Sequence, residues 1–165
     1  EYYQILVDTL LAVRIEPFKK RQSRNVIISA PKYYLFDVGV SGILTKRHLE
    51  GAKGEEFGKA FEHFIFMEIN AYNSYSDSNF DVNFWRTKSG LEVDFVLGKG
   101  EIAIEVKGSD RIDGRDLKSL KVFIEEYSPK RAVVVCNEKE RRVCGKIQIV
   151  PWRDFLSDLW SDKIL

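Results

Sequence analysis

Hydrophobic residues recur at helical spacing in several stretches of the chain. The longest stretch is residues 55–72, where Phe57, Phe61 and Phe64 mark the apolar stripe of a predicted amphipathic helix. Further helices are predicted over residues 1–11, 38–44 and 116–127, and from Pro151 toward the end of the chain. Residues 45–54 are polar and contain two glycines, which predicts a loop before the long helix.

Short runs of β-branched and aromatic residues predict strands. Three of these runs follow the long helix, near residues 81–87, 92–97 and 102–107. The run RAVVVC, residues 131–136, is almost continuously apolar, as expected for a strand covered on both faces. Other strands are predicted at residues 13–18, 25–29, 33–37 and 146–150. A meander of strands that passes into helical crossovers predicts an α/β fold with a mixed sheet flanked by helices.

Composition narrows the range of functions. A chain of 165 residues with 44% hydrophobic residues can form one packed domain. Its net charge of +1 means that contact with nucleic acid must come from local patches or a bound metal ion. No apolar run is long enough to span a membrane. Cys136 and Cys144 match no zinc-binding spacing, so we expect free thiols in the cytoplasm.

The first residues already have a helical pattern, without a capping residue before them. The chain begins at Glu1, and Met67 is its only methionine. We expect that the sequence is a piece of a larger protein, although removal of a short tag or of a disordered start explains the same observation.

The segment LEVDFVLGKGEIAIEVKG, residues 91–108, is typical of a β-hairpin with glycines at its turn. If Lys99 and Gly100 are the two loop residues, Asp94 faces Glu105 across the hairpin. Side chains that face each other directly have Cβ atoms roughly 4.5–5.5 Å apart.

Alternation along the hairpin predicts one charged and one apolar face. Glu92, Asp94, Glu105 and Lys107 share the first face. The second face is expected to be buried against a helix and carries Val93, Phe95, Leu97, Ile102, Ile104 and Val106.

Two facing carboxylates repel each other unless a cation relieves them. A hard divalent ion, Mg²⁺ or Mn²⁺, would accept oxygens from Asp94 and Glu105 and support phosphodiester hydrolysis. Lys107 would position or deprotonate the attacking water, or stabilise the pentacovalent state. The alternative is a solvated sheet face on which Lys107 forms an ion pair with Glu92 or Glu105.

Asp94 followed by Glu105-Val106-Lys107 resembles the motif of the PD-(D/E)XK nuclease superfamily, with Val93 in place of the proline. The resemblance implies a restriction-endonuclease-like fold, whose core of helix, three strands, helix and strand (αβββαβ) matches residues 55–137. It also implies that DNA is the partner.

A closer resemblance covers most of the chain. The segments PKYYLFDVGVSGIL, KGEEFGKAFEHFIFMEINAY, FWRTKSGLEVDFVL and IEVKGSD look like the uncharacterised C-terminal (DUF4143-type) domain of prokaryotic AAA-type ATPases. This implies that residues 1–30 end a winged-helix-like segment, that residues 31–165 form the nuclease-like domain, and that an ATPase module precedes them. The chain contains no GxxxxGK[ST] motif and therefore no P-loop for ATP. Two functions stay open: a Mg²⁺-dependent DNA nuclease, or a catalytically silent module that binds DNA or a protein partner for the ATPase.

The superfamily resemblance implies a further glutamate on the first helix, and Gly58 with Glu62 fits its Gly-x-x-x-Glu spacing. Glu62 lies at the edge of the apolar stripe, whereas Glu68 lies in its middle. We therefore predict Asp94, Glu105 and Glu62 as metal ligands and catalytic residues, together with Lys107. Glu68 is the alternative helical carboxylate, or else a core group paired with Lys88 or Arg86.

Several basic residues are candidates for nucleic-acid contact. Arg86 precedes the acidic hairpin, and Lys118 lies on the helix that follows it; the remaining candidates are Lys19, Lys20 and Arg21 in the basic tip. Each has a simpler explanation as a solvated or ion-paired residue. His63, next to Glu62, is expected on the surface of its helix.

Overall fold

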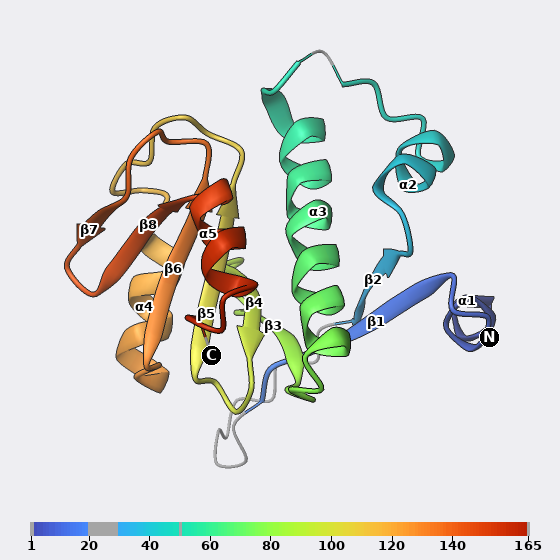
Figure 1. Ribbon diagram of the computed structural model, residues 1–165, viewed down its shortest axis with the longest axis horizontal. Helices are drawn as coiled ribbons and strands as arrows, with labels where there is room; N and C mark the ends of the chain where they lie inside the picture. Colours follow the sequence, from blue (N-terminus) through green and yellow to red (C-terminus); the bar gives the residue numbers. More distant parts are fainter. Residues whose placement is uncertain (1, 20–29, 50, 165) are drawn as a thin grey trace.

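The computed structural model of the chain describes residues 2–19, 30–49 and 51–164. Within these ranges the chain folds around a sheet with strand order β2-β1-β3-β4-β5-β6-β8-β7 (Figure 1). The helices are α1 (Tyr2–Asp8), α2 (Val38–Leu44), α3 (Gly54–Tyr75), α4 (Lys118–Tyr127) and α5 (Trp152–Leu159). The strands are β1 (Ala12–Pro17), β2 (Lys32–Leu35), β3 (Val82–Arg86), β4 (Glu92–Leu97), β5 (Ile102–Lys107), β6 (Arg131–Cys136), β7 (Arg142–Cys144) and β8 (Ile147–Pro151).

The sheet is mixed, as the order of elements predicts. Strands β3, β4 and β5 form an antiparallel meander, and β5, β6 and β8 run parallel. Strand β1 lies antiparallel to β2 and parallel to β3, so that it belongs to the same sheet. The predicted α/β class is therefore confirmed.

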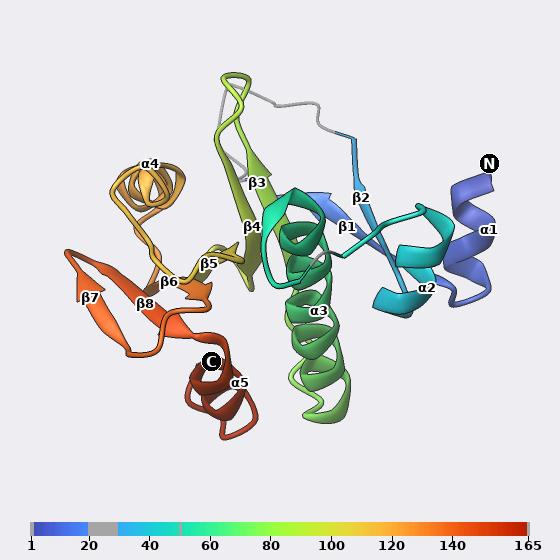
Figure 2. The same ribbon diagram turned by 90° about the horizontal axis from the view of Figure 1, so that it is seen from above.

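Helices cover both faces of the sheet (Figure 2). One apolar cluster packs α3 and α5 against Phe95, Ile104 and Val135. The other packs α4 against Val96, Ala103 and Val134. Each buried strand therefore contributes apolar side chains to both faces, which explains the continuous hydrophobic run in β6.

Helix α3 has the position and the length that its apolar stripe predicts. It begins at Gly54 and ends at Tyr75, with the acidic pair Glu55 and Glu56 in its first turn. Acidic residues suit this end because the helix dipole is positive there. The other predicted elements from residue 81 onward also form, within a few residues of their expected bounds.

The hairpin of β4 and β5 has the predicted register, with Phe95 paired to Ile104 and Leu97 to Ile102. Gly100 has a φ of +87°, and a Cβ there would come within 2.7 Å of the Phe18 ring. The turn therefore requires glycine at this position both for its backbone conformation and for space.

The expected alternation along β4 is wrong at one position. Strand β3 pairs Asn83 with Val96 but Trp85 with Val93, so β4 contains one extra residue between these pairs. This bulge turns Val93 toward α4, whereas Phe95 packs against α3. The physical reason is that an extra residue shifts the side-chain alternation by one position.

Other differences are smaller. Strand β7 forms the far edge of the sheet and was not expected from its basic sequence. Pro151 ends β8 and precedes α5 as its N-cap residue. The strand expected at residues 25–29 lies outside the described residues. None of the described helices combines the length and hydrophobicity that a membrane span requires.

Candidate functional site

Asp94 and Glu105 are buried close to the point where the ladder between β4 and β5 ends. The last pair of that ladder is Phe95 with Ile104, and Asp94 and Glu105 are the next residue on each strand beyond this pair. Oδ2 of Asp94 accepts a hydrogen bond of 2.7 Å from the backbone N–H of Val106 on β5. Asp94 lies within the bulge of β4, and its carboxylate accepts a hydrogen bond from the backbone of β5.

Glu105 has one partnered and one unpartnered oxygen. Oε1 accepts a hydrogen bond of 2.6 Å from Nζ of Lys107. Oε2 is buried and has no hydrogen-bond partner among the residues that the structure describes. Because a buried polar atom without a partner is costly, such an atom in a native fold calls for an explanation, for example a bound ion.

The pKa values of both acids are raised. Burial raises the pKa of Asp94 well above its ordinary value, and the negative charge of Glu105 adds to this effect. Burial also raises the pKa of Glu105 to about 7, although the charge of Lys107 opposes the shift. Asp94 and Glu105 are therefore not readily ionised at the same time. A divalent cation bound between them would relieve their repulsion and favour the ionised forms.

Lys107 remains a cation beside this pair. Burial lowers the pKa of its ammonium group, but the charge of Glu105 and their hydrogen bond outweigh burial, so the pKa is raised. An ammonium group with a raised pKa does not take up a proton from water at neutral pH. Of the roles expected for Lys107, the raised pKa therefore favours stabilisation of negative charge over deprotonation of water.

A second cluster connects α3 to β2 and β4. Nζ of Lys32 lies 3.0 Å from Oε1 of Glu62 and 2.5 Å from Oε1 of Glu92. The hydroxyl of Tyr34 donates a hydrogen bond of 2.5 Å to the same Oε1 of Glu62. Burial opposes the ionised form of Lys32, but the charges of Glu62, Asp94 and Glu92 raise its pKa.

Sequence reasoning did not identify Lys32 and Tyr34. The available signal was weak: the two residues are two positions apart in a short strand and therefore share one face. Only the packing of β2 beside α3 shows that this face carries the cation that neutralises Glu62 and Glu92.

The two candidate glutamates of α3 face different surroundings. Glu62 lies close enough for its charge to raise the pKa of both Asp94 and Glu105. Glu68 accepts a hydrogen bond of 2.9 Å from Nε1 of Trp160 at the end of α5. Of the two, Glu62 is the carboxylate that acts on the buried pair.

The alternative pairing of Glu68 and the expected position of His63 both differ from the structure. Glu68 accepts its hydrogen bond from Trp160 rather than from Lys88 or Arg86, and Arg86 forms an ion pair with Glu92. His63 is buried rather than on the helix surface, and its Nε2 lies 2.7 Å from the carbonyl oxygen of Leu35. The apolar face of α3 is therefore wider than its aromatic stripe indicates.

The three predicted metal ligands do not form one compact cluster. Within residues 2–19, 30–49 and 51–164, no three His, Cys, Asp or Glu side chains gather as a metal site would require. Glu62 is held by Lys32 and Tyr34 instead. The pair of Asp94 and Glu105 nevertheless fits Mg²⁺, which binds proteins through one or two carboxylates and keeps several waters.

The predicted nucleic-acid contacts are dispersed. Arg86 pairs with Glu92 and thus borders the site. Lys118 is exposed at the start of α4, and Lys19 is exposed after β1. Lys20 and Arg21 lie outside the described residues.

Replacing Lys32 by alanine is expected to destabilise the protein by about 1–3 kcal/mol near pH 8, because three carboxylates lose their cation. The loss should be smaller near pH 5, because the raised pKa of Asp94 favours its neutral form there, and one of the three charges that Lys32 balances is then removed. Urea unfolding at the two pH values measures the difference. Lys130→Ala, which removes an exposed pair with Glu101, is the matched control and should change stability little at either pH. An equal loss for Lys32→Ala at both pH values would contradict the proposed charge balance.

Comparison with known proteins adds one finding. Residues 57–155, more than half of the chain, match a family described as "Domain of unknown function (DUF4143)". No curated protein and no solved structure matches the chain. The matched residues include α3 from Phe57 onward, the strands β3 to β6 and all four predicted catalytic residues.

Proposed function

The chain belongs to the DUF4143 family, and from the geometry of its buried carboxylates we propose that it is a Mg²⁺-dependent nuclease domain that hydrolyses phosphodiester bonds in DNA. The observation that carries the proposal is the pair of Asp94 and Glu105, buried together with one oxygen of Glu105 left without a partner. A structural role alone does not account for two mutually repelling acids at this position.

The fold supports the same proposal. Helix α3, strands β3 to β5, helix α4 and strand β6 follow the order of the PD-(D/E)XK core, and Asp94 and Glu105 lie on its second and third strands. We assign the chain to this restriction-endonuclease-like class. Its resemblance to the C-terminal part of AAA-type ATPases makes an ATPase module of the same protein the proposed partner.

The residues of the site have separate roles in this reaction. Asp94 and Glu105 would hold Mg²⁺ or Mn²⁺, with Glu62 beside them. The bound ion would supply a water of lowered pKa and stabilise charge on a phosphoryl oxygen. The N–H of Val106 fixes the orientation of the Asp94 carboxylate.

Positive side chains complete the site. Lys107, held at Glu105, keeps its proton and stabilises the negative charge that develops on the phosphate. Lys32 and Tyr34 hold the Glu62 side chain through its Oε1. Burial and the charge of Glu62 raise the pKa of Tyr34, so the hydroxyl retains the proton that it donates.

A cleavage assay tests the proposal directly. The protein is incubated with supercoiled plasmid and with single- and double-stranded oligonucleotides, in Mg²⁺, in Mn²⁺ or in EDTA. We expect metal-dependent cleavage that falls about 100-fold in Lys107→Ala, because charge stabilisation at the phosphate is lost. Lys121→Ala, an exposed lysine of α4, is the matched control and should cleave like the wild type. Absence of metal-dependent cleavage, or equal cleavage by Lys107→Ala, contradicts the proposal.

One observation favours a second function. The ammonium of Lys32 already lies between Glu62 and Glu92, and its charge acts on Asp94. A site neutralised by its own lysine suits a catalytically silent module that binds DNA or a protein partner for the ATPase. The silent module predicts DNA binding without cleavage in either metal, so the same assay separates the two functions.

A further inference from the structure

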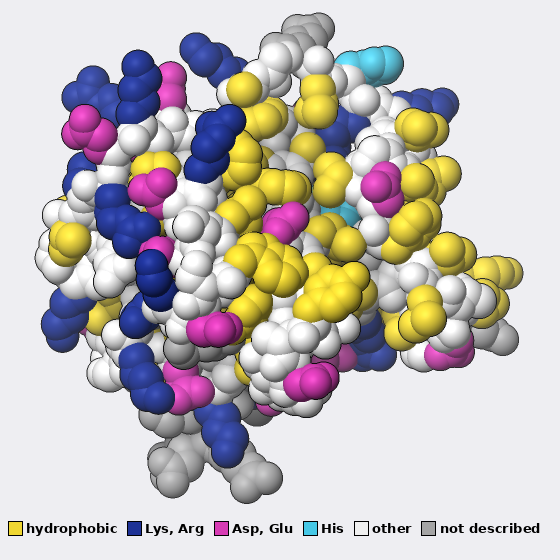
Figure 3. Space-filling view, in the orientation of Figure 1, with side chains coloured by type: hydrophobic (Ala, Val, Ile, Leu, Met, Phe, Trp, Pro, Cys, Tyr) yellow, Lys and Arg dark blue, Asp and Glu magenta, His cyan; other side chains and the backbone are white. Residues whose placement is uncertain are grey.

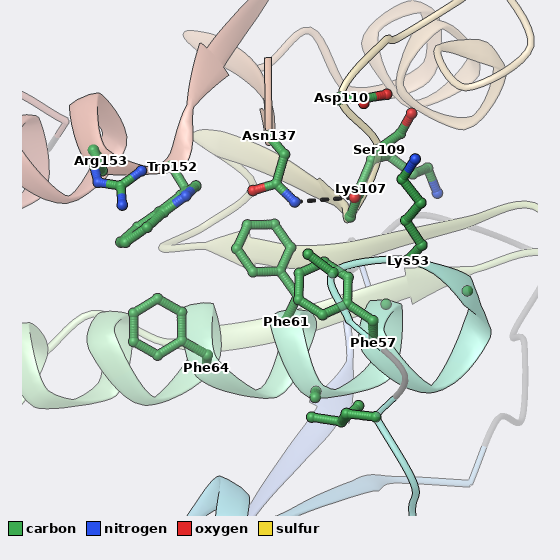
Figure 4. Close-up of a pocket in the computed structure, with 16 residues that line it drawn as sticks. Lys53, Phe57, Phe61, Phe64, Lys107, Ser109, Asp110, Asn137, Trp152 and Arg153 are labelled. Atoms are coloured by element: carbon green, nitrogen blue, oxygen red, sulfur yellow. Dashed lines mark hydrogen bonds between the residues drawn. The ribbon is translucent and has the colours of Figure 1, made fainter. Parts of the chain in front are cut away.

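A cavity of about 900 Å³ lies beside Lys107, between the first turns of α3 and the edge of the sheet (Figure 4). Gly108, Asn137 and Trp152 line it, and each directly follows one of the parallel strands β5, β6 and β8. Open α/β sheets bind ligands beyond the carboxyl ends of such strands. The volume lies within the range of roughly 300–1,000 Å³ that is typical of small-molecule sites.

Aromatic rings form two sides of this cavity. Phe57 and Phe61 of α3 lie nearly parallel, with ring centres 5.7 Å apart. Phe64 and Trp152 meet edge to face at 5.8 Å, and Figure 4 shows Trp152 next to Phe64, with Phe61 and Phe57 further along α3. Flat walls of this kind suit a planar aromatic ring, because bases stack on aromatic side chains.

The side-chain amide of Asn137 adds a polar group beside these rings. Nδ2 of Asn137 donates a hydrogen bond of 3.0 Å to the carbonyl oxygen of Gly108 (Figure 4). This bond fixes the amide and leaves its side-chain oxygen as an acceptor for a donor on the edge of a base.

The rim of the cavity is positively charged. Lys53, Lys107 and Arg153 line it, against the single acid Asp110. Within the described part of the chain, Lys53 and Arg153 form no ion pair, although the guanidinium of Arg153 lies over the Trp152 ring at 4.3 Å. Figure 3 shows hydrophobic side chains gathered along the seam between α3 and α5, with Lys and Arg side chains beside it. Unpaired cations around an aromatic cavity favour an anionic, aromatic ligand.

From this combination we infer that the cavity binds an unpaired nucleobase of single-stranded DNA, with the flanking phosphates at Lys53 and Arg153. The inference rests on the proposed nuclease function and names its substrate class, because Lys107 borders both the cavity and the carboxylate pair. A base inside a duplex is stacked and paired, so it enters such a cavity only after it leaves the helix. Single strands, flaps and frayed ends are therefore the substrates that fit this site.

The variant Gly58→Leu tests the cavity without removing any existing contact. Gly58 lines the cavity, and a Cβ at this position would meet no other atom within 4 Å. Leucine also favours helix more than glycine does, so α3 is expected to form normally. The side chain would fill space that the base occupies.

Binding is measured in EDTA, by fluorescence anisotropy of labelled oligothymidylate of about 12 nucleotides, so that no cleavage is required. We expect Gly58→Leu to bind this strand about tenfold more weakly than the wild type does. The same loss is expected when the wild type binds an abasic strand of equal length, which keeps the phosphates but lacks the bases. Gly42→Leu, on helix α2 with equally open space, is the matched control. A double variant, Lys53→Ala with Arg153→Ala, is expected to weaken binding as well, because it removes the two cations that flank the cavity.

The outcomes are distinct for the two proposals. Absence of single-strand binding by the wild type, equal binding of the abasic strand, or unchanged binding by Gly58→Leu overturns the inference about the cavity, whether or not the protein cleaves DNA. Base-dependent binding that Gly58→Leu weakens supports the inference even if no metal-dependent cleavage occurs, in which case the nuclease proposal alone fails. If Gly58→Leu does not fold, the double variant and the abasic strand decide.

Discussion

Replacing Asp94 by asparagine is expected to reduce Mg²⁺-dependent cleavage by about 1,000-fold or more and, at the same time, to stabilise the metal-free protein. The loss of cleavage follows because asparagine is a weaker ligand for a hard cation, and the charge stabilisation that such a cation supplies is worth several kcal/mol. The carboxylate is therefore retained for chemistry and not for stability.

The gain in stability has a separate cause. Burial and the charge of Glu105 raise the pKa of Asp94, so the ionised form destabilises the fold near pH 8. Asparagine removes that charge, and its side-chain oxygen can still accept the N–H of Val106. We expect a gain of about 1–2 kcal/mol in the free energy of unfolding near pH 8, the order of magnitude for relieving an unfavourable buried charge.

Urea unfolding near pH 8, with and without Mg²⁺, measures both effects. Mg²⁺ should stabilise the wild type and leave Asp94→Asn unchanged, because a ligand stabilises only the state that binds it. Asp81→Asn makes the same chemical change at an exposed position and should retain cleavage and the response to Mg²⁺. An equal response to Mg²⁺ in Asp94→Asn, or a loss of stability in the metal-free variant, would show that Asp94 is not a ligand of this kind.

The metal-free wild type is expected to lose about 3 kcal/mol of stability between pH 5 and pH 8. The pKa of Glu105 is raised from 4.5 to about 7 in the folded state. Between these values the folded protein holds a proton that the unfolded chain has released, so stability falls as pH rises through the window. The stability that protonation of Glu105 contributes is fully present below its pKa in the unfolded chain and is lost above its pKa in the folded protein. A pKa difference of this size is worth roughly 3 kcal/mol. Asp94 contributes in the same direction.

Urea unfolding in EDTA at several pH values measures this slope. Glu105→Gln should flatten it, because the amide does not titrate, and Mg²⁺ should flatten it in the wild type. A wild type that is more stable at pH 8 than at pH 5, or a slope that Glu105→Gln leaves unchanged, would contradict the burial of an ionisable pair. The test requires no nuclease activity and therefore examines the site by itself.

Local patterns determined much of the fold. The aromatic stripe in residues 55–72 predicts α3, and the apolar run of residues 131–136 predicts β6. Both signals are long and regular, so tertiary contacts only reinforce them. The register of the hairpin was also predictable, because its glycines fix the turn and the turn fixes the pairing.

Tertiary packing decided what local patterns cannot encode. The bulge in β4 arises from the pairing of β4 with β3, and it turns Val93 to the opposite face from Phe95. Burial of His63 depends on β2, which supplies the carbonyl of Leu35 from a distant part of the chain. Strand β7 forms because β8 offers it a free edge, although its own sequence is only three residues long.

By itself, the sequence determined that an aspartate and a glutamate stand on neighbouring strands of one hairpin, since a turn and an alternation of side chains require only local information. Only the tertiary structure decided how deeply the two acids are buried, that Lys32 and Tyr34 hold Glu62, and that a cavity opens beside Lys107. Burial, charge balance and empty space depend on distant segments that meet in the fold, and no local pattern records which segments will meet.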